Sequence, residues 1–201
     1  MINTDPAHVV FLCGIATYLA IRAAFQYRFS AEKKTVRNST ASDRLLIVLV
    51  ATGQVVLPLV FLFTSWLNKA DYTLPAFAIW VGTPLMVAAL WLFWRAHADL
   101  GNCWSVTLEL NHDHRLVTHG VYQFIRHPMY ASFFGLALSQ VFLINNALAG
   151  WAAMVSVTLL YVLRIPHEER MMLETFGDEY RCYMERAHSL IPRWRASPVE
   201  R

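Results

Sequence analysis

Five apolar segments separated by polar connectors make up the hydrophobic pattern of this chain. They occupy residues 9–25, 45–67, 74–94, 130–144 and 147–163, and the second and third contain no charged residue. A helix needs roughly 20 apolar residues to cross the hydrocarbon core of a bilayer, so the last two segments are short for independent spans. The pattern predicts an all-α polytopic membrane protein with about five transmembrane helices.

The last two segments are separated only by Asn145 and Asn146. Two adjacent amides inside one long buried helix would each need a hydrogen-bond partner in hydrocarbon, whereas a turn at the membrane surface exposes them to water. We therefore predict a tight helical hairpin, with one continuous helix as the alternative. Because both arms are short, we do not expect the hairpin to reach the far interface unaided.

Proline and glycine mark further breaks in the pattern. Pro58 and Pro84 lie inside the second and third segments, where each removes a backbone donor and favours a kink. Such a kink either opens a pocket in the bundle or is an ordinary feature of a span. After residue 163 the chain becomes amphipathic: Pro166 suits the first turn of a new helix, and Gly177 separates that helix from a second short one. We predict cytoplasmic C-terminal helices after the fifth span.

The basic residues predict an orientation. They are frequent in the connector 26–44 and after residue 163, and three more lie between residues 95 and 127. Cytoplasmic loops of membrane proteins carry such an excess of positive charge. Lys69 alone falls in an outer loop, and Arg22 can extend to the surface from the inner end of the first span. We expect the N-terminus outside, and the C-terminus and the polar motifs in the cytoplasm.

Composition narrows the classes of protein. With 56% hydrophobic and 15% charged residues, the 201-residue chain is not an ordinary water-soluble domain. The net charge of +3 comes without a basic stripe interleaved with aromatic residues, so no nucleic-acid partner is expected. Three scattered cysteines do not form a disulfide framework. We expect one integral-membrane domain over residues 1–201, with three spans in residues 1–94 and a catalytic core in residues 95–201.

Two polar motifs flank the predicted hairpin. The sequence Arg-His-Pro-Met-Tyr occupies residues 126–130, and Glu168 and Glu169 follow the fifth segment. A folded hairpin returns both ends to one membrane face, so we expect these side chains to line a single polar site. Each motif has a plainer interpretation, because Arg and Tyr are common interface anchors and carboxylates favour helix starts. A carboxylate also binds the two hydroxyls of a ribose, and its combination with His and Tyr favours a nucleoside-containing ligand.

A histidine-rich stretch raises the alternative of a metal site. His112 and His114 are two residues apart, and His119 and His127 follow. No thiolate and no helical His spacing completes a ligand set, so we expect no metal.

Five motifs follow one another in the second half of the chain. They are Leu-Gly-Asn-Cys-Trp-Ser at 100–105, Leu-Val-Thr-His-Gly-Val-Tyr at 116–122, Arg-His-Pro-Met-Tyr at 126–130, Glu-Glu at 168–169 and Phe-Gly-Asp-Glu-Tyr at 176–180. In order and spacing they resemble the isoprenylcysteine carboxyl methyltransferase and phospholipid methyltransferase family, particularly its small five-span prokaryotic members. The resemblance covers about residues 95–194.

The resemblance implies an integral protein of a prokaryotic cell membrane that uses S-adenosylmethionine as methyl donor and releases S-adenosylhomocysteine. By this resemblance the cofactor-binding residues are His114, Arg115, Leu116, Val117, Tyr122, His127, Pro128, Met129, Tyr130 and Glu168. Arg164 matches a substrate-side arginine, and Arg164 and Glu168 are the candidate catalytic residues; a snorkelling arginine is the alternative for Arg164. Glu109 lies near a further family position, but the loop there differs in length, so that role is not transferred.

Methyl transfer from a sulfonium requires alignment of donor and acceptor rather than a covalent enzyme group, and no nucleophilic triad is visible. The expected partner is a lipid or lipidated small molecule from the bilayer: a prenyl-cysteine carboxylate, a phospholipid amine or a small thiol. Arg164 favours an anionic acceptor, because a guanidinium orients a carboxylate. An amine acceptor would have to lose a proton, and His127 or a carboxylate would take it.

Two other functions remain open from sequence. An NADPH-dependent membrane reductase of the sterol-reductase type shares a His-Pro-x-Tyr motif, but it has extra spans and a longer polar cofactor region. A non-catalytic membrane scaffold would leave the matched motifs without a purpose. The oligomeric state is not indicated by the sequence.

Overall fold

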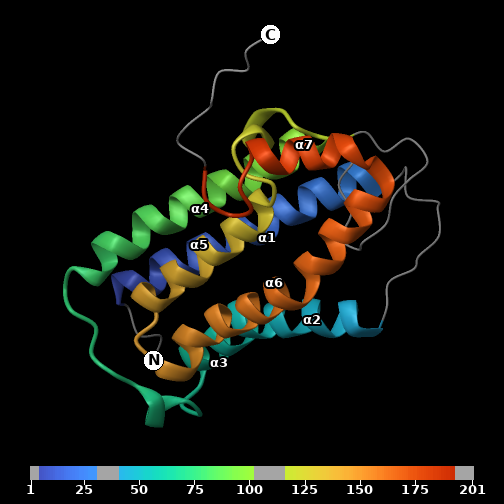
Figure 1. Cartoon of the computed structure of the whole chain (residues 1–201). Coiled ribbons are helices and arrows are strands. Elements are labelled where there is room, and N and C mark those ends of the chain that lie inside the picture. The colour runs from blue at the N-terminus through green and yellow to red at the C-terminus, as the bar shows by residue number, and fades with distance from the viewer. Residues whose placement is uncertain (1–4, 31–40, 102–115, 193–201) are drawn as a thin grey trace.

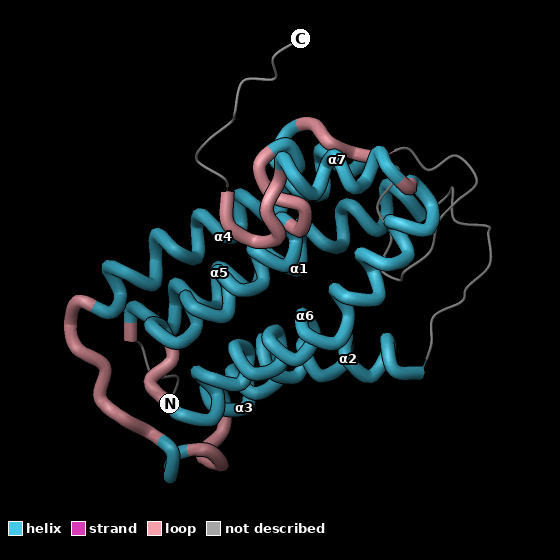
Figure 2. The backbone as a smooth tube through the Cα atoms, viewed as in Figure 1, coloured by secondary structure: helices cyan, strands magenta, loops and turns pink. Residues whose placement is uncertain are grey.

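Seven α-helices run through the residues that the computed structural model describes, which are 5–30, 41–101 and 116–192. They are α1 (Pro6–Ser30), α2 (Ala41–Ala51), α3 (Leu57–Phe63), α4 (Ala78–Leu100), α5 (Pro128–Leu143), α6 (Ala147–Phe176) and α7 (Asp178–Arg186). Three short turns lie between them: the π turn η1 (Thr52–Val56) and the 3-10 turns η2 (Asn68–Ala70) and η4 (Gly120–Gln123). Figure 2 shows that the described part of the chain is helices and loops.

The described residues contain four stretches that are long and apolar enough to cross a bilayer: Pro6–Arg28, Ala41–Phe63, Ala78–Leu100 and Ala147–Phe176. Helix α5 is apolar but shorter. These five stretches correspond to the five predicted segments. The fourth is short, as predicted, but the fifth was also predicted to be short and is part of a helix of 30 residues that is long enough to span. The prediction of an all-α membrane protein is confirmed.

The break predicted at Pro166 is wrong, because α6 continues through this proline as one helix of 30 residues. A proline inside a helix forfeits one hydrogen bond, here to the carbonyl of Val162. Both residues lie on an exposed part of α6, where the helix can bend without disturbing a packed interface. Figure 1 shows that α6 changes direction along its length before it meets α7. The polar C-terminal part is therefore an extension of the fifth span, followed by α7.

Two layers of helices meet along α5 and α6. Figure 1 shows α1, α4 and α5 side by side, and α6 extending from α5 towards α2 and α3, in agreement with the helix pairs that are in contact. Aromatic and aliphatic side chains of α1, α4 and α5 form the larger buried cluster, including Phe11, Tyr18, Met86, Phe93, Leu136 and Leu143. Helices α4 and α5 approach closely where Gly135 faces Ala89, because a Cβ at Gly135 would lie 2.9 Å from the Ala89 Cβ.

The second span contains a π turn whose free carbonyl is bound by α5. The Leu57 N–H bonds to the carbonyl of Thr52, five residues back, instead of to Gly53. Pro58, the next residue, has no N–H to donate. The Gly53 carbonyl instead accepts from Gln140 Nε2 at 3.0 Å, and the same amide donates to a carbonyl of α6. The break predicted at Pro58 is thus filled by a polar side chain that joins three elements.

The turn between α5 and α6 confirms the predicted hairpin and excludes the single long helix. Asn146 caps α6: its Oδ1 accepts from two amides of the first turn, at 2.9 and 3.1 Å. Its Nδ2 donates to the Leu67 carbonyl and to Asp71 Oδ1, both at 2.7 Å. Asn145 is held by a 3.0 Å contact of its Oδ1 with His8 Nε2. From the sequence we expected water to satisfy these amides, but Asn146 is fully buried and both side chains are bound by other parts of the chain.

Candidate active site

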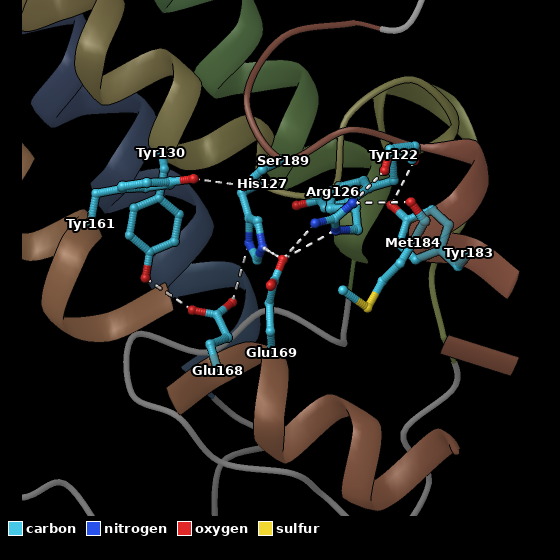
Figure 3. Close-up of polar contacts among 11 residues, drawn as sticks. Tyr122, Arg126, His127, Tyr130, Tyr161, Glu168, Glu169, Tyr183, Met184 and Ser189 are labelled. Carbon is cyan, nitrogen blue, oxygen red and sulfur yellow. Dashed lines mark hydrogen bonds and ion pairs between the residues drawn. The ribbon is translucent and has the colours of Figure 1, made fainter. Parts of the chain in front are cut away.

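The first turn of α5 and the second half of α6 are joined by a hydrogen bond between Tyr130 and Glu168. The Tyr130 hydroxyl donates to Glu168 Oε2 at 2.9 Å, and Figure 3 shows the two side chains pointing towards one another. Tyr130 is 8% exposed, whereas 25% of the Glu168 side chain is exposed. The hairpin thus brings the two residues together, as the sequence predicts, and leaves part of the carboxylate open.

His127 lies between the two carboxylates of α6. Its Nε2 is 3.1 Å from Glu169 Oε1, and its Nδ1 is 3.9 Å from Glu168 Oε1. Pro128 at the start of α5 keeps His127 out of the helix, with φ −124° and ψ 61°. The imidazole is buried at 5% exposure and packs edge-on against Tyr130. The proline therefore determines where the imidazole enters the site.

Arg126 connects three parts of the chain. Its Nε and Nη2 donate to Glu169 Oε1 at 3.1 and 2.8 Å, and its Nη1 donates to the carbonyls of Met184 and Ala187 at the end of α7. The backbone is held as well, since the Arg126 amide donates to the carbonyl of His188 at 2.7 Å. Helix α6, the end of α7 and the entry to α5 thus form one connected polar layer (Figure 3).

Buried tyrosines support this layer. Tyr183 of α7 donates its hydroxyl to the Tyr122 carbonyl at 2.6 Å, and the Tyr122 hydroxyl lies 3.5 Å from the Ala96 carbonyl on α4. Burial raises the pKa of Tyr183, and burial together with the negative charge of Glu168 raises the pKa of Tyr122. Both phenols therefore remain protonated at neutral pH. Tyr122, predicted to contact the cofactor, has its hydroxyl directed at the backbone of α4.

The turn that carries Tyr122 is anchored by Asp99. Asp99 Oδ2 accepts from the Val121 amide at 2.8 Å, and the carboxylate pairs with Arg95 at 2.9 Å. Gly120 has φ +61°, and a Cβ at this position would collide with the Asp99 carboxylate. Glycine is required here both for the left-handed backbone and for the close approach.

Four more residues of the predicted site, Arg164, Leu116, Val117 and Met129, lie in the described part of the chain. Arg164 is half-buried on α6, one helical turn before Glu168, and its positive charge acts on the Tyr130 phenol. Leu116 packs against the cluster of α7, and Val117 and Met129 are half-buried. Arg164 and Glu168 lie on the same side of α6 because they are four residues apart on this helix.

Some sequence predictions lie outside the described residues. These are His114 and Arg115 of the cofactor set, together with Glu109 and His112. Among the described residues, no group of three or more His, Cys, Asp or Glu side chains has an arrangement that would hold a metal ion.

An apolar groove of about 790 Å³ lies on the outer face of α4. It is lined by Ile79, Trp80, Thr83, Pro84, Val87, Ala88 and Trp91. Since every lining residue belongs to α4 and none is charged, this groove is separate from the polar layer and is a surface for apolar contacts.

Sequence reasoning missed several residues of the polar layer. It did not pair Arg126 with Glu169, and it gave no role to Asp99, Tyr161 or Ser189. The Tyr161 and Ser189 hydroxyls are 2.8 Å apart, and the Tyr161 ring packs edge-on against Tyr130. A usable signal existed for the carboxylates: adjacent residues on a helix point about 100° apart, so Glu168 and Glu169 need different partners.

A family model and a relative that matches most of this chain point to the same family. Residues 80–174 match the model of the isoprenylcysteine carboxyl methyltransferase (ICMT) family. A "probable protein-S-isoprenylcysteine O-methyltransferase" of Oryza sativa subsp. indica is 28% identical over 186 residues, covering 88% of this chain and 93% of that protein.

Two other relatives match a shorter part of this chain. The protein-S-isoprenylcysteine O-methyltransferase of Schizosaccharomyces pombe is 36% identical over 87 residues, which is 43% of this chain and 37% of that protein. Methanethiol S-methyltransferase 1 of Bradyrhizobium diazoefficiens is 38% identical over 84 residues, which is 41% of this chain and 28% of that protein.

The fold is also similar to that of a solved structure. The eukaryotic intramembrane Ras methyltransferase ICMT superimposes with a TM-score of 0.54 at 24% identity, covering 91% of this chain and 67% of that one. At this identity the likeness supports the shared membrane fold.

Proposed function

Since this chain belongs to the isoprenylcysteine carboxyl methyltransferase family, we propose that it transfers a methyl group from S-adenosylmethionine to a membrane-partitioned acceptor. The observation that carries the proposal is the hydrogen bond between Tyr130 and Glu168. It unites the two halves of the predicted cofactor site, one before the hairpin and one after it. The relatives reported above are methyltransferases, and they lend no support to the alternative of an NADPH-dependent reductase.

The polar layer has the groups that this cofactor requires. S-adenosylmethionine supplies a methyl group activated on a sulfonium, and it carries hydrogen-bond donors on its ribose and amino end. The exposed part of Glu168 is a charged acceptor for such donors. The aromatic rings of Tyr130 and Tyr161 are suited to a cation, because an aromatic face attracts positive charge. His127 adds a second polar group beside the carboxylate.

Arg164 is the proposed substrate-side residue. A guanidinium orients a carboxylate through paired hydrogen bonds, and Arg164 lies one turn from Glu168 on α6. We therefore propose an isoprenylcysteine-like carboxylate as the acceptor. One of its oxygens forms the new bond to the methyl carbon while the bond from methyl to sulfur breaks, and the electron pair stays on sulfur. This displacement needs alignment above all, so Arg164 and Glu168 act by holding the two reactants in line.

The membrane location divides the two ligands between two routes. The four long apolar helices make this an integral membrane protein. We propose that the polar layer lies on the cytoplasmic side, following the distribution of basic residues. The soluble cofactor would then enter from the cytoplasm, and the acceptor would enter laterally from the bilayer.

Calorimetry of the purified protein tests the cofactor site. We expect S-adenosylhomocysteine to bind the wild type, and Glu168→Ala and Tyr130→Ala to lose the heat of binding. Two matched controls should bind normally. They are Glu174→Ala, at an exposed position of α6, and Tyr27→Ala, near the end of α1, where Tyr27 is 89% exposed. Unchanged binding in both site variants would remove this site assignment, and binding of NADPH instead would favour the reductase.

The acceptor is tested separately with methyl-labelled cofactor. The acceptors to compare are an S-farnesylcysteine derivative, a phospholipid with an amine head group, and methanethiol. The thiol arm is included because one relative is a methanethiol S-methyltransferase. We expect labelling of the prenylated carboxylate, with Arg164→Ala raising its KM. Labelling of the thiol alone would replace the carboxylate as the proposed acceptor.

A further inference from the structure

Glu169 has partners different from those of Glu168 and takes a different role. On the basis of the function proposed above, we propose that Glu169 and Arg126 are positioning residues for His127. They hold its imidazole as the tautomer with hydrogen on Nε2, so that the bare Nδ1 is presented beside Glu168 as an acceptor for a donor group of the bound ligand.

The contacts of Glu169 determine where the imidazole hydrogen lies. A single oxygen, Oε1, is within 3.1 Å of Arg126 Nε, 2.8 Å of Arg126 Nη2 and 3.1 Å of His127 Nε2. An oxygen that already receives two guanidinium N–H groups is an ionised acceptor. His127 Nε2 must therefore be a donor to it, and the hydrogen is placed on Nε2.

No contact of the described residues requires a hydrogen on Nδ1. Arg126 and Glu169 are only 11% and 21% exposed at their side chains, and their opposite charges compensate each other. An additional positive charge on His127 is therefore not required by Glu169. Glu168 already accepts a hydrogen bond from Tyr130 and lies on the same helical face as Arg164. The distances around the ring are thus satisfied by a single imidazole hydrogen, on Nε2, because Nδ1 is 3.9 Å from Glu168 Oε1.

The backbone of His127 is held as firmly as its ring. Its amide donates to the carbonyl of Ser189 at 3.0 Å, and its carbonyl accepts from the Ala131 amide at 3.0 Å. Pro128 restricts it further from the other side. Since the backbone is fixed from both sides, the contact with Glu169 selects the ring orientation and the tautomer.

In the described part of the chain, the result is a pair of acceptors without a donor placed between them. His127 Nδ1 and Glu168 Oε1 are 3.9 Å apart, which is too long for a direct hydrogen bond. An ammonium group, which has several hydrogens, would complete the pair by donating one to each atom. A polar donor group of the cofactor has this chemistry, and so we place one there.

The first test is nitrogen NMR of the wild-type protein labelled with 15N-histidine in lipid nanodiscs. The His127 resonances are assigned by their loss in His127→Asn or His127→Gln. We expect one hydrogen-bearing nitrogen, Nε2, and one bare nitrogen, Nδ1, at neutral pH. Finding the hydrogen on Nδ1, or on both nitrogens, overturns the proposal. This measurement requires no ligand and no folded Glu169 variant.

The second test is a double-mutant cycle on the binding of S-adenosylhomocysteine. We expect Glu169→Gln to weaken binding by about 10- to 100-fold, by analogy with metal-binding histidines that lose their orienting partner. In a His127→Asn background the same substitution should change binding by no more than about 2-fold, because it acts through His127. Arg126→Lys, which keeps the charge but loses the forked geometry, should fall between.

Glu174→Gln is the matched control, being the same substitution at an exposed position of the same helix. An equal loss with and without His127 would reveal a merely structural role for Glu169 and overturn the proposal. The proposed function fails differently: if the wild type binds no S-adenosylhomocysteine, the tautomer measured by NMR still decides the role of Glu169.

Discussion

At the scale of single residues, the polar layer depends on buried tyrosines rather than on tyrosines that anchor the surface. Tyr122, Tyr180 and Tyr183 are buried, and burial raises the pKa of each. The Tyr183 hydroxyl satisfies the carbonyl of Tyr122, just before the loop that carries Arg126. Tyr122 and Tyr183 must keep their protons for these contacts to persist.

Tyr183→Phe is therefore expected to lower stability by about 1 kcal/mol at neutral pH, because it leaves the buried Tyr122 carbonyl without its donor. The wild type should also lose stability above about pH 10, where the unfolded chain ionises its tyrosines and the folded chain does not. The fall should be less steep in Tyr183→Phe. Thermal unfolding followed by circular dichroism from about pH 8 to about pH 11 measures both effects.

Tyr27→Phe is the control for this experiment, because Tyr27 is 89% exposed. Its melting temperature should match the wild type at every pH. If the two variants behave alike, the Tyr183 hydroxyl makes no contribution.

At the scale of helices, the hairpin turn is held by Asn146 in two directions. Its side chain caps α6 and also binds Leu67 and Asp71 of the connector between α3 and α4. We expect Asn146→Ala to cost about 1–2 kcal/mol from the lost cap alone, and more because the Leu67 carbonyl and the Asp71 carboxylate lose their donor. Asn68→Ala, at an exposed position of the same connector, should leave the melting temperature unchanged. Equal melting temperatures for the two variants would contradict a stabilising role for the turn.

The close contact between α4 and α5 can be tested with one substitution that destabilises the protein and a second that should restore its stability. A Cβ at Gly135 meets the Ala89 Cβ at 2.9 Å, closer than side-chain carbons approach one another. Gly135→Ala should therefore destabilise the protein by about 1–3 kcal/mol through overpacking. Ala89→Gly in the same molecule removes the opposing carbon and should restore most of the loss. A double variant as unstable as Gly135→Ala would show that the helices are separated by some other contact.

These helices also show how far the sequence allows prediction. Apolar length and the Asn145-Asn146 pair were enough to predict five segments and the hairpin, because hydrocarbon leaves a chain few alternatives. Pro166 was misread, since a proline on an exposed helical face bends a helix as readily as it starts one. Whether the second span would be continuous was also not predictable, because the π turn depends on Gln140 from another helix.

The sequence predicted which helices form the candidate site, but not which side chains in it pair with one another. The hairpin topology alone brings Tyr130 near Glu168. The pairing of Arg126 with Glu169 depends on the rotation of α6 and on the chain after α7, which supplies carbonyl partners for the same guanidinium. Such long-range contacts are set by packing, which local sequence patterns do not encode.

At the scale of the whole molecule, the chain has two polar ends joined by apolar helices. At one end of α5 lie His127 and Glu169, and at the other end Asn146 and its partners close the turn. Because α5 runs between them through the bundle, we predict that the two polar ends lie on opposite sides of the membrane. Positive charge gathers on the side of His127, which predicts that side to be cytoplasmic.

The orientation is tested with single cysteines in a background in which all three native cysteines are replaced by serine. Lys69→Cys reports the hairpin-turn side, and Glu174→Cys reports the side of the candidate site; both positions are exposed. A membrane-impermeant maleimide on intact cells should label Lys69→Cys and spare Glu174→Cys until the membrane is opened. Labelling of Glu174→Cys in intact cells would put the polar layer outside, where a cytoplasmic pool of S-adenosylmethionine does not reach it. Labelling of both after opening is the control that each thiol is reactive.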